Sequence, residues 1–302
     1  MDVALLLALA LALDAVFGEP DWLWRRMPHP AVLMGRAIGW ADRKYNTGSA
    51  RRSKGTGVVA CLCLAAAVLG WALSLVGPGV EVLLAAILLA QRSLVEHVRA
   101  VAEALRIGLP EGRAAVAMIV GRDTKELPAE GVARAAIESA SENFSDGVVA
   151  PAFWFLLGGL PGILVYKVVN TADSMVGYRT PRHEAFGWAA ARLDDGLNWI
   201  PARLSAVLIA LGKGKLSQMV AIARDARLHR SPNAGWPEAA MARGLDVALA
   251  GPRSYEGQMQ DFPFIHPNGQ HQIGARQIEA ACANLWRSWA LLFGVVLLLA
   301  LL

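Results

Sequence analysis

Apolar residues gather into five blocks along the chain, and hydrophilic segments separate them. The blocks are Val3–Phe17, Val58–Val76, Val80–Ala90, Val148–Val169 with Ile200–Leu211 close behind it, and Ser288–Leu302. A helix that crosses a bilayer needs about 20 mainly apolar residues. Val58–Val76 meets that requirement by itself. The pattern therefore predicts an all-α, polytopic integral membrane protein.

The second and third blocks are joined by a sequence that favours a tight turn. Gly77, Pro78 and Gly79 stand between them, and glycine and proline are the strongest turn-forming residues. The third block, Val80–Ala90, can continue through Leu94 as the returning arm. We therefore predict a transmembrane hairpin over residues 58–94.

The distribution of basic residues predicts which segments face the cytoplasm. Segments 18–56, 91–147 and 212–287 hold eight, seven and nine Lys/Arg residues, and short loops rich in these residues stay in the cytoplasm. We expect one membrane-embedded domain over residues 1–302, multi-pass in the cell inner membrane. Residues 212–287 would form a cytoplasmic helical segment, and an active site would lie on the cytoplasmic side.

A glycine- and proline-rich break divides the fourth block, and two interpretations remain open. If Val148–Val169 and Ile200–Leu211 both span the membrane, Asn170–Asp195 lies on its far side. Alternatively, the break at Gly158–Gly162 lets the chain dip into the membrane and return. Irregular backbone at membrane depth persists only inside protein or beside a wet cavity, and the polar residues that follow suit such a cavity. We favour a re-entrant, broken helix over residues 148–169.

The composition excludes several classes of protein. The 302-residue chain has 29 Lys+Arg and 25 Asp+Glu, a net charge of +4, and no long basic run interleaved with aromatic residues. Nucleic acid is therefore not an expected partner. Charged residues are 18% of the chain, against about 25% in soluble domains. Three cysteines without a C-x-x-C motif argue against a disulfide framework. The lipid bilayer is the partner that this composition implies.

Three acidic residues precede the broken block at helical spacing. Glu138, Glu142 and Asp146 are four residues apart, so on a helix they fall within one arc of about 80°. Carboxylates stacked in this way can hold hard cations such as Mg²⁺. The alternative is that Arg134 and Glu138 form an ion pair on a solvated surface, and both interpretations stay open.

Three further clusters contain residue types that bind phosphate or a cation. They comprise Asn170, Asp173, Ser174 and Arg182; Arg192 and Asp194; and His229, Arg230, Ser231 and Asn233. Arginine beside serine and asparagine is a plausible phosphate-binding mixture. Walker A, H-E-x-x-H and G-x-S-x-G sequences do not occur, so a nucleotide would bind outside the common motifs.

With these clusters, the chain resembles the integral-membrane CobD/CbiB family, the adenosylcobinamide-phosphate synthases of cobalamin biosynthesis. The matching stretches follow one another along nearly the whole chain. They are Asp14–Pro20 with Pro28-His29-Pro30, Val120–Thr124, Glu138–Pro151, Asn170–Tyr178, Phe186–Asp195, His229–Glu238, and Gly251-Pro252 with Tyr255 and Gly257. The terminal apolar blocks match only in composition.

The resemblance implies an amide-forming ligase. Such enzymes join (R)-1-amino-2-propanol, or its O-phosphate, to the free propionate carboxylate of adenosylcobyric acid, which gives adenosylcobinamide or its phosphate. Amide formation from a carboxylate in water is uphill, so ATP and Mg²⁺ are implied as cofactors, with an acyl phosphate on the path. The two substrates are the implied partners, together with other membrane enzymes of late cobalamin assembly.

The resemblance also implies roles for individual residues. The expected catalytic residues are Glu142, Asp146, Asp173 and His229, of which His229 is the candidate general base. The expected metal ligands are Glu138, Glu142, Asp146 and Asp194. The expected substrate- and phosphate-binding residues are Arg122, Asn143, Asn170, Ser174, Arg182, Arg192, Arg230, Ser231 and Asn233.

Two other classes remain as alternatives. A membrane transferase acting on lipids would carry paired acidic motifs such as D-x-x-D-G-x-x-A-R, which do not occur. A transporter would use the broken helix in its substrate path, although such folds usually show a matching break in their other half. ATP turnover that requires both a corrinoid and an aminoalcohol would distinguish the ligase from both.

The predicted topology can be tested with single cysteines on a cysteine-free background. We expect Ala50→Cys and Glu130→Cys to react with a membrane-impermeant thiol reagent only from the cytoplasmic side, because both lie in basic segments. Cytoplasmic labelling of Thr180→Cys would support re-entrance, and labelling from the periplasm alone would support export. Periplasmic labelling of position 50 or 130 would contradict the topology.

Overall fold

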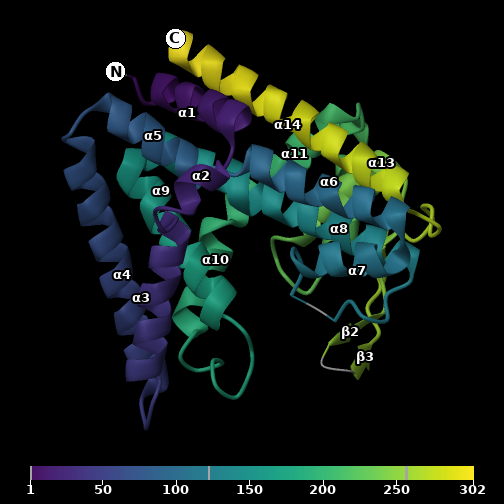
Figure 1. Ribbon diagram of the computed structural model, residues 1–302, viewed down its shortest axis with the longest axis horizontal. Helices are drawn as coiled ribbons and strands as arrows, with labels where there is room; N and C mark the ends of the chain where they lie inside the picture. Colours follow the sequence, from purple (N-terminus) through teal and green to yellow (C-terminus); the bar gives the residue numbers. More distant parts are fainter. Residues whose placement is uncertain (1, 122, 256–257) are drawn as a thin grey trace. The chain divides into compact units, whose positions relative to one another are not determined.

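A computed structural model describes residues 2–121, 123–255 and 258–302 (Figure 1). The first eight helices are α1 (Val3–Phe17), α2 (Asp21–Trp24), α3 (Pro30–Tyr45), α4 (Arg51–Ser74), α5 (Pro78–Leu88), α6 (Gln91–Ile107), α7 (Leu109–Ala117) and α8 (Ala129–Phe144). They are followed by α9 (Ala150–Val176), α10 (Trp188–Leu197), α11 (Trp199–Gly212), α12 (Met219–Ala226), α13 (Gly235–Leu245) and α14 (Ala275–Leu301). A π-helical turn at Ser145–Val149 joins α8 to α9, and a 3₁₀ turn at Leu216–Gln218 precedes α12.

Extended structure is limited, in the described residues, to two short antiparallel pairs. β1 (Leu249–Ala250) pairs with β4 (Phe264–Ile265), and β2 (Arg253–Tyr255) pairs with β3 (Gln258–Gln260). Within the described ranges, four helical stretches are long and apolar enough to cross a membrane, namely Arg51–Ser74, Pro78–Ile107, Ala129–Val176 and Ala275–Leu301. The predicted all-α membrane fold is confirmed by these helices.

The chain forms two compact units, which are described separately. Unit 1 comprises Met1–Ala90, Ala150–Trp199 and Val296–Leu302. Unit 2 comprises Gln91–Val149 and Ile200–Val295. Each unit is held together by contacts between segments that are distant in the sequence. That the whole chain acts as one membrane-embedded domain stays a prediction.

In unit 1, α4 packs closely along α9 and α10. The core beside them consists of Ile38, Val59, Ala172, Val176, Phe186 and Ala190. Gly70 brings the α4 backbone against α9, because a Cβ at this position would lie 2.6 Å from the Cα of Pro161. Small residues permit such close helix approach inside membranes.

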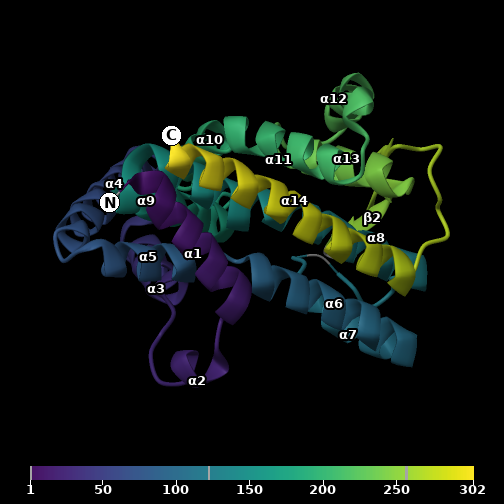
Figure 2. The same ribbon diagram turned by 90° about the horizontal axis from the view of Figure 1, so that it is seen from above.

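The predicted turn after α4 is present, but its two arms diverge. α4 ends at Ser74, and α5 begins at Pro78. From the turn the two helices run in different directions (Figures 1 and 2), and α5 packs on α1 and α9. Tertiary contacts rather than the short turn therefore set the direction of α5. A membrane crossing over residues 58–94 stays a prediction.

α9 is interrupted within the glycine- and proline-rich sequence, as predicted. Gly159 has φ 58° and ψ −149°, which lies outside the helical region. Glycine adopts a positive φ without steric cost. Pro161 follows two residues later and lacks the N–H that a continuous helix would use. The sequence therefore breaks the helix by two independent local effects.

Both halves of α9 reach the same end of α10. Before the break, Trp154 Nε1 donates a hydrogen bond to the carbonyl oxygen of Leu197 at 3.1 Å. After the break, the Tyr166 hydroxyl donates to Oδ1 of Asn198 at 3.0 Å. The break thus bends α9 around α10 instead of extending it.

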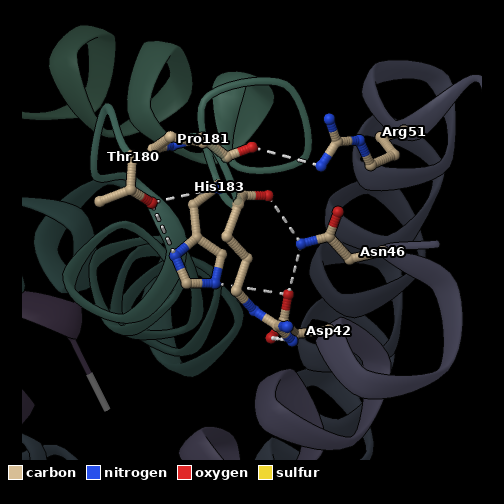
Figure 3. Close-up of polar contacts among 7 residues, drawn as sticks. Asp42, Asn46, Arg51, Thr180, Pro181 and His183 are labelled. Carbon is tan, nitrogen blue, oxygen red and sulfur yellow. Dashed lines mark hydrogen bonds and ion pairs between the residues drawn. The ribbon is translucent and has the colours of Figure 1, made fainter.

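The loop after α9 lies beside the connection between α3 and α4 (Figure 3). Arg51 donates to the carbonyl oxygen of Pro181 at 3.3 Å, and Nδ2 of Asn46 donates to the carbonyl oxygen of Arg182 at 3.0 Å. These bonds place the loop beside the first residues of the candidate span α4. A re-entrant segment over residues 148–169, rather than export of Asn170–Asp195, stays a prediction.

Unit 2 is built around α8, which packs on α6, α7 and α13. The buried residues of α8 include Val132, Ala136, Ile137, Ala140 and Phe144. Small side chains alternate here with large ones, so neighbouring helices lie close while the larger residues fill the space between them. The same core continues through Ile209 of α11 and Leu285 of α14.

Gly70→Ala tests the close packing of α4 on α9. The added Cβ would meet backbone atoms of Pro161, which cannot rotate away, and overpacking of this kind costs about 1–3 kcal/mol. We expect a lower midpoint of thermal unfolding in detergent. Gly57→Ala on the same helix is the control, since nothing lies within 4 Å of its Cβ position. Equal midpoints for the two variants would contradict the packing.

Candidate functional site

Unit 1 contains a buried acid surrounded by amides. Asp194 of α10 is 9% exposed. Its Oδ1 accepts from Nδ2 of Asn170 at 3.3 Å, and its Oδ2 accepts from Nδ2 of Asn198 at 3.0 Å. The Tyr166 hydroxyl in turn donates to Asn198. Packing of α9 against α10 thus brings together residues from the second and third predicted clusters.

Burial and a second acid change the protonation of this group. Burial raises the pKa of Asp194 to about 7, and the carboxylate of Asp173 contributes to the same shift. Two carboxylates that interact in this way favour a shared proton or a bound cation. Burial also raises the pKa of Asp195, against the opposing effect of Arg192 and Arg179.

The other predicted residues of unit 1 have partners within the protein. Arg182 donates to Oδ2 of Asp42 at 2.7 Å. Arg192 lies 3.8 Å from Oδ2 of Asp195 on the exposed side of α10. The hydroxyl of Ser174 donates to the carbonyl oxygen of Asn170 at 2.9 Å. Ser174 therefore has a local structural role within α9, and Arg182 joins the loop after α9 to α3.

The three acids of the first cluster do not assemble into one metal site. Glu138 is 5% exposed, and its Oε1 accepts the backbone N–H of Ala250 at 2.7 Å. The π-helical turn over Ser145–Val149 changes the helical register before Asp146 can follow Glu142 by one α-helical turn. Among the described residues, no group of three or more His, Cys, Asp or Glu side chains could hold a metal. The predicted Glu138–Glu142–Asp146 cluster is corrected on this point.

Glu142 and Asp146 still offer suitable oxygen ligands. Glu142 is exposed and Asp146 is half-buried. Mg²⁺ in proteins is typically held by one or two carboxylates together with substrate phosphates and water. Glu142 and Asp146 are residues of this ligand type, and that they bind one cation together stays a prediction. Between them, Nδ2 of Asn143 donates to the carbonyl oxygen of Ser139 at 2.9 Å, within α8.

In unit 2, the two ring nitrogens of His229 both have neighbours. Its Nδ1 accepts the backbone N–H of Ser231 at 3.0 Å, so the proton of the neutral ring is on Nε2. That Nε2 lies 3.7 Å from Oε1 of Glu238, which is 2% exposed. His229 could accept a proton at Nδ1 only if the bond from Ser231 were broken.

The remainder of this loop is organised around Arg203, which the sequence analysis did not single out. Arg203 of α11 donates to Oδ1 of Asn233 at 3.4 Å and stacks on Trp236, with 4.7 Å from its guanidinium carbon to the ring centroid. The sequence could have indicated Arg203, because it is an arginine inside the apolar block Ile200–Leu211. A charged side chain in such a block is costly unless it has a partner. Ser231 Oγ accepts the N–H groups of Asn233 and Ala234 and so shapes the entry to α13.

Two predicted arginines remain. Arg230 is exposed, and its guanidinium carbon lies 6.0 Å from the ring centroid of Phe262. Arg122 lies outside the residues that the structure describes. Beneath the loop, Arg243 donates to Asp225 at 2.8 Å, and this buried ion pair joins α12 to α13.

Comparison with known proteins finds one family that matches most of this chain. The model of the family described as CobD/Cbib protein matches residues 7–285. "Cobalamin biosynthesis protein CobD" of Brucella anthropi is 48% identical over 98% of this chain and 97% of its own length. Proteins with the same name from a Sinorhizobium species and Rhizobium meliloti are 49% and 50% identical, over 99% and 93% of this chain and 98% and 91% of their own. No solved structure matches the chain.

Asp194→Asn tests the buried acid. Folded Asp194 holds its proton up to about pH 7, whereas an unfolded aspartate releases it near pH 4. This group therefore destabilises the fold increasingly as pH rises from about 4 to about 7, and by a constant amount above that. Asparagine resembles the protonated form, so we expect the variant to unfold at the same temperature as wild type near pH 4 and at a higher temperature at pH 8.

Glu184→Gln provides the control for this measurement, because Glu184 is an exposed acid of the same unit. Its unfolding temperature should follow that of the wild type at every pH. A difference between Asp194→Asn and wild type that stays constant from pH 4 to pH 8 would contradict the raised pKa.

Proposed function

The chain belongs to the CobD/CbiB family, and on that basis we propose that it acts in cobalamin biosynthesis as an ATP-dependent amide ligase. The proposed reaction joins (R)-1-amino-2-propanol, or its O-phosphate, to the free propionate carboxylate of adenosylcobyric acid. The observation that carries this proposal is the similarity over almost the full length to relatives named for cobalamin biosynthesis.

The chemistry requires activation of a carboxylate and removal of a proton. In the proposed path, the propionate oxygen attacks the γ-phosphorus of ATP, which releases ADP and gives an acyl phosphate. The neutral amine then attacks the acyl carbon, loses a proton and expels inorganic phosphate. The enzyme must therefore bind phosphoryl oxygens, neutralise their charge and accept one proton.

The following residues are proposed to supply these three functions. Glu142 and Asp146 are the proposed Mg²⁺ ligands, and bound Mg²⁺ would neutralise charge on the ATP phosphates. Arg230, at the edge of its loop, is a proposed contact for phosphoryl oxygens. Asp194 and His229 are the two candidate proton acceptors, and the bond from Ser231 to Nδ1 makes His229 the less accessible of the two.

A transporter is the second candidate, because the broken helix α9 is typical of substrate paths. A ligase and a transporter differ in their use of ATP and in whether the corrinoid is chemically changed. A ligase uses ATP only when both organic substrates are present and releases a new amide. A transporter would move a corrinoid across the membrane without changing its mass.

The ligase proposal also includes its surroundings. The substrates arise from cytoplasmic metabolism, so the active site is proposed to face the cytoplasm from the inner membrane. Adjacent steps convert other corrinoids of the same size and polarity, and membrane enzymes of late cobalamin assembly are the proposed neighbours.

The decisive assay uses detergent-purified protein with adenosylcobyric acid, ATP, Mg²⁺ and either amine, and detects the product by its mass. We expect Glu142→Gln and Asp146→Asn each to lower turnover by about 10²-fold or more, because each removes a charge that stabilises the transition state. Glu96→Gln is the matched control, as Glu96 is an exposed glutamate on α6 of the same unit. Near-normal turnover in both site variants would contradict the proposed Mg²⁺ ligands. Absence of the amide product with folded wild-type protein would contradict the ligase proposal.

A further inference from the structure

One end of unit 1 carries a dense group of cations. Residues 40–54 and 178–192 together contain eight Lys/Arg and two Asp/Glu residues. The first segment runs from the end of α3 into α4, and the second runs from the loop after α9 into α10. The number of basic residues in either segment by itself is no greater than in an ordinary basic loop.

Hydrogen bonds hold the two segments together around Asp42 (Figure 3). Asp42 accepts from Arg182 at 2.7 Å and from Asn46 at 2.8 Å, and Nε2 of His183 lies 3.5 Å from its Oδ1. The nearly buried carboxylate is thereby committed to groups inside the protein. The remaining cations therefore gather at one surface without a matching number of acids.

Two of these cations are stacked on exposed aromatic rings. Arg52 lies over Trp188, with 3.7 Å between the guanidinium carbon and the ring centroid, and Nζ of Lys44 lies 4.8 Å from the ring centroid of Trp40. Trp188 is 39% exposed and Trp40 is 52% exposed. Pairs of this kind hold the side chain in place while leaving its charged end accessible. We call Trp40, Lys44, Arg52 and Trp188 the basic–aromatic collar.

The position of the collar along α4 places it at the depth of lipid headgroups. The apolar part of the candidate span Arg51–Ser74 begins at Val58, which is about 10 Å along the helix from its start. Trp40 lies five residues before the end of α3, or about 7.5 Å, so it stands close to the boundary of the apolar region. Tryptophan and basic residues prefer this interfacial level.

We propose that the basic–aromatic collar is a binding site for the phosphate groups of anionic phospholipids in the surrounding leaflet. The cations supply the charge complementarity, and the exposed indoles supply the contact with acyl chains that a soluble phosphate ligand would not need. The site would join α3, α4 and α10 at their membrane-facing end. The proposal does not depend on the ligase reaction.

The test uses the full-length protein in nanodiscs that contain phosphatidylcholine and phosphatidylglycerol in equal amounts. Native mass spectrometry of the released protein measures the ratio of the two lipids that remain bound. We expect phosphatidylglycerol to be enriched on wild type. The enrichment should fall at least about fivefold in the double variant Lys44→Gln/Arg52→Gln, since a basic residue near an anionic surface contributes about 1 kcal/mol, which corresponds to that ratio.

Two further variants make the result specific. Lys125→Gln/Lys215→Gln removes the same charge from exposed lysines of unit 2 and should keep the wild-type enrichment. Lys44→Arg/Arg52→Lys changes the same two side chains but keeps both charges, so it should keep most of the phosphatidylglycerol enrichment. That result would attribute the loss in the glutamine variant to the missing charge and not to a change of side chain at these positions.

Three results would overturn the proposal. One is an unchanged lipid ratio in Lys44→Gln/Arg52→Gln, and another is an equal loss in the variant of unit 2. The third is displacement of phosphatidylglycerol from wild type by millimolar ATP or inorganic phosphate that also binds in discs of phosphatidylcholine alone. That last result would assign the collar to a soluble phosphate ligand instead.

Discussion

The break in α9 is the constraint on which the structure of unit 1 depends. Lipid cannot satisfy the peptide groups that a bend exposes at membrane depth, so protein must cover them. α4 does this, because Gly70 lets its backbone approach Pro161 directly. With the bend fixed, the second half of α9 carries Asn170 to Asp194, and the loop beyond it reaches Asn46. The acid site and the basic–aromatic collar are therefore consequences of one covered break.

Two of the buried acids, Glu138 and Asp194, show how burial can serve structure or chemistry. Glu138 accepts a hydrogen bond from the backbone N–H of Ala250, and such a bond stabilises a buried carboxylate. Asp194 accepts from two amides but also lies near Asp173, and burial raises its pKa to about 7. A buried group that opposes the stability of the fold at neutral pH is typical of functional sites. This contrast is the reason for proposing Asp194, rather than Glu138, as a proton acceptor.

The arginines show the same dependence on partners. Arg182 follows the polar run at the end of α9, yet it binds Asp42 and joins two segments of unit 1. Arg203 stands in an apolar block, yet it meets Asn233 and Trp236 in the loop that also carries His229. An arginine's role is decided by which acid or ring lies within its reach, and that neighbour is distant in the sequence for both.

The sequence by itself determined the helical class, the apolar blocks and the break in α9, because length, hydropathy and the backbone limits of glycine and proline are local properties. It also determined the family, because the motifs follow one another along the whole chain. Only the tertiary structure decided that Glu138 turns toward Ala250, 112 residues away, and that Arg182 pairs with Asp42, 140 residues away. It also decided that a π-helical turn separates Asp146 from the register of Glu142. Such choices arise from packing between distant segments, and no spacing pattern along one helix encodes them.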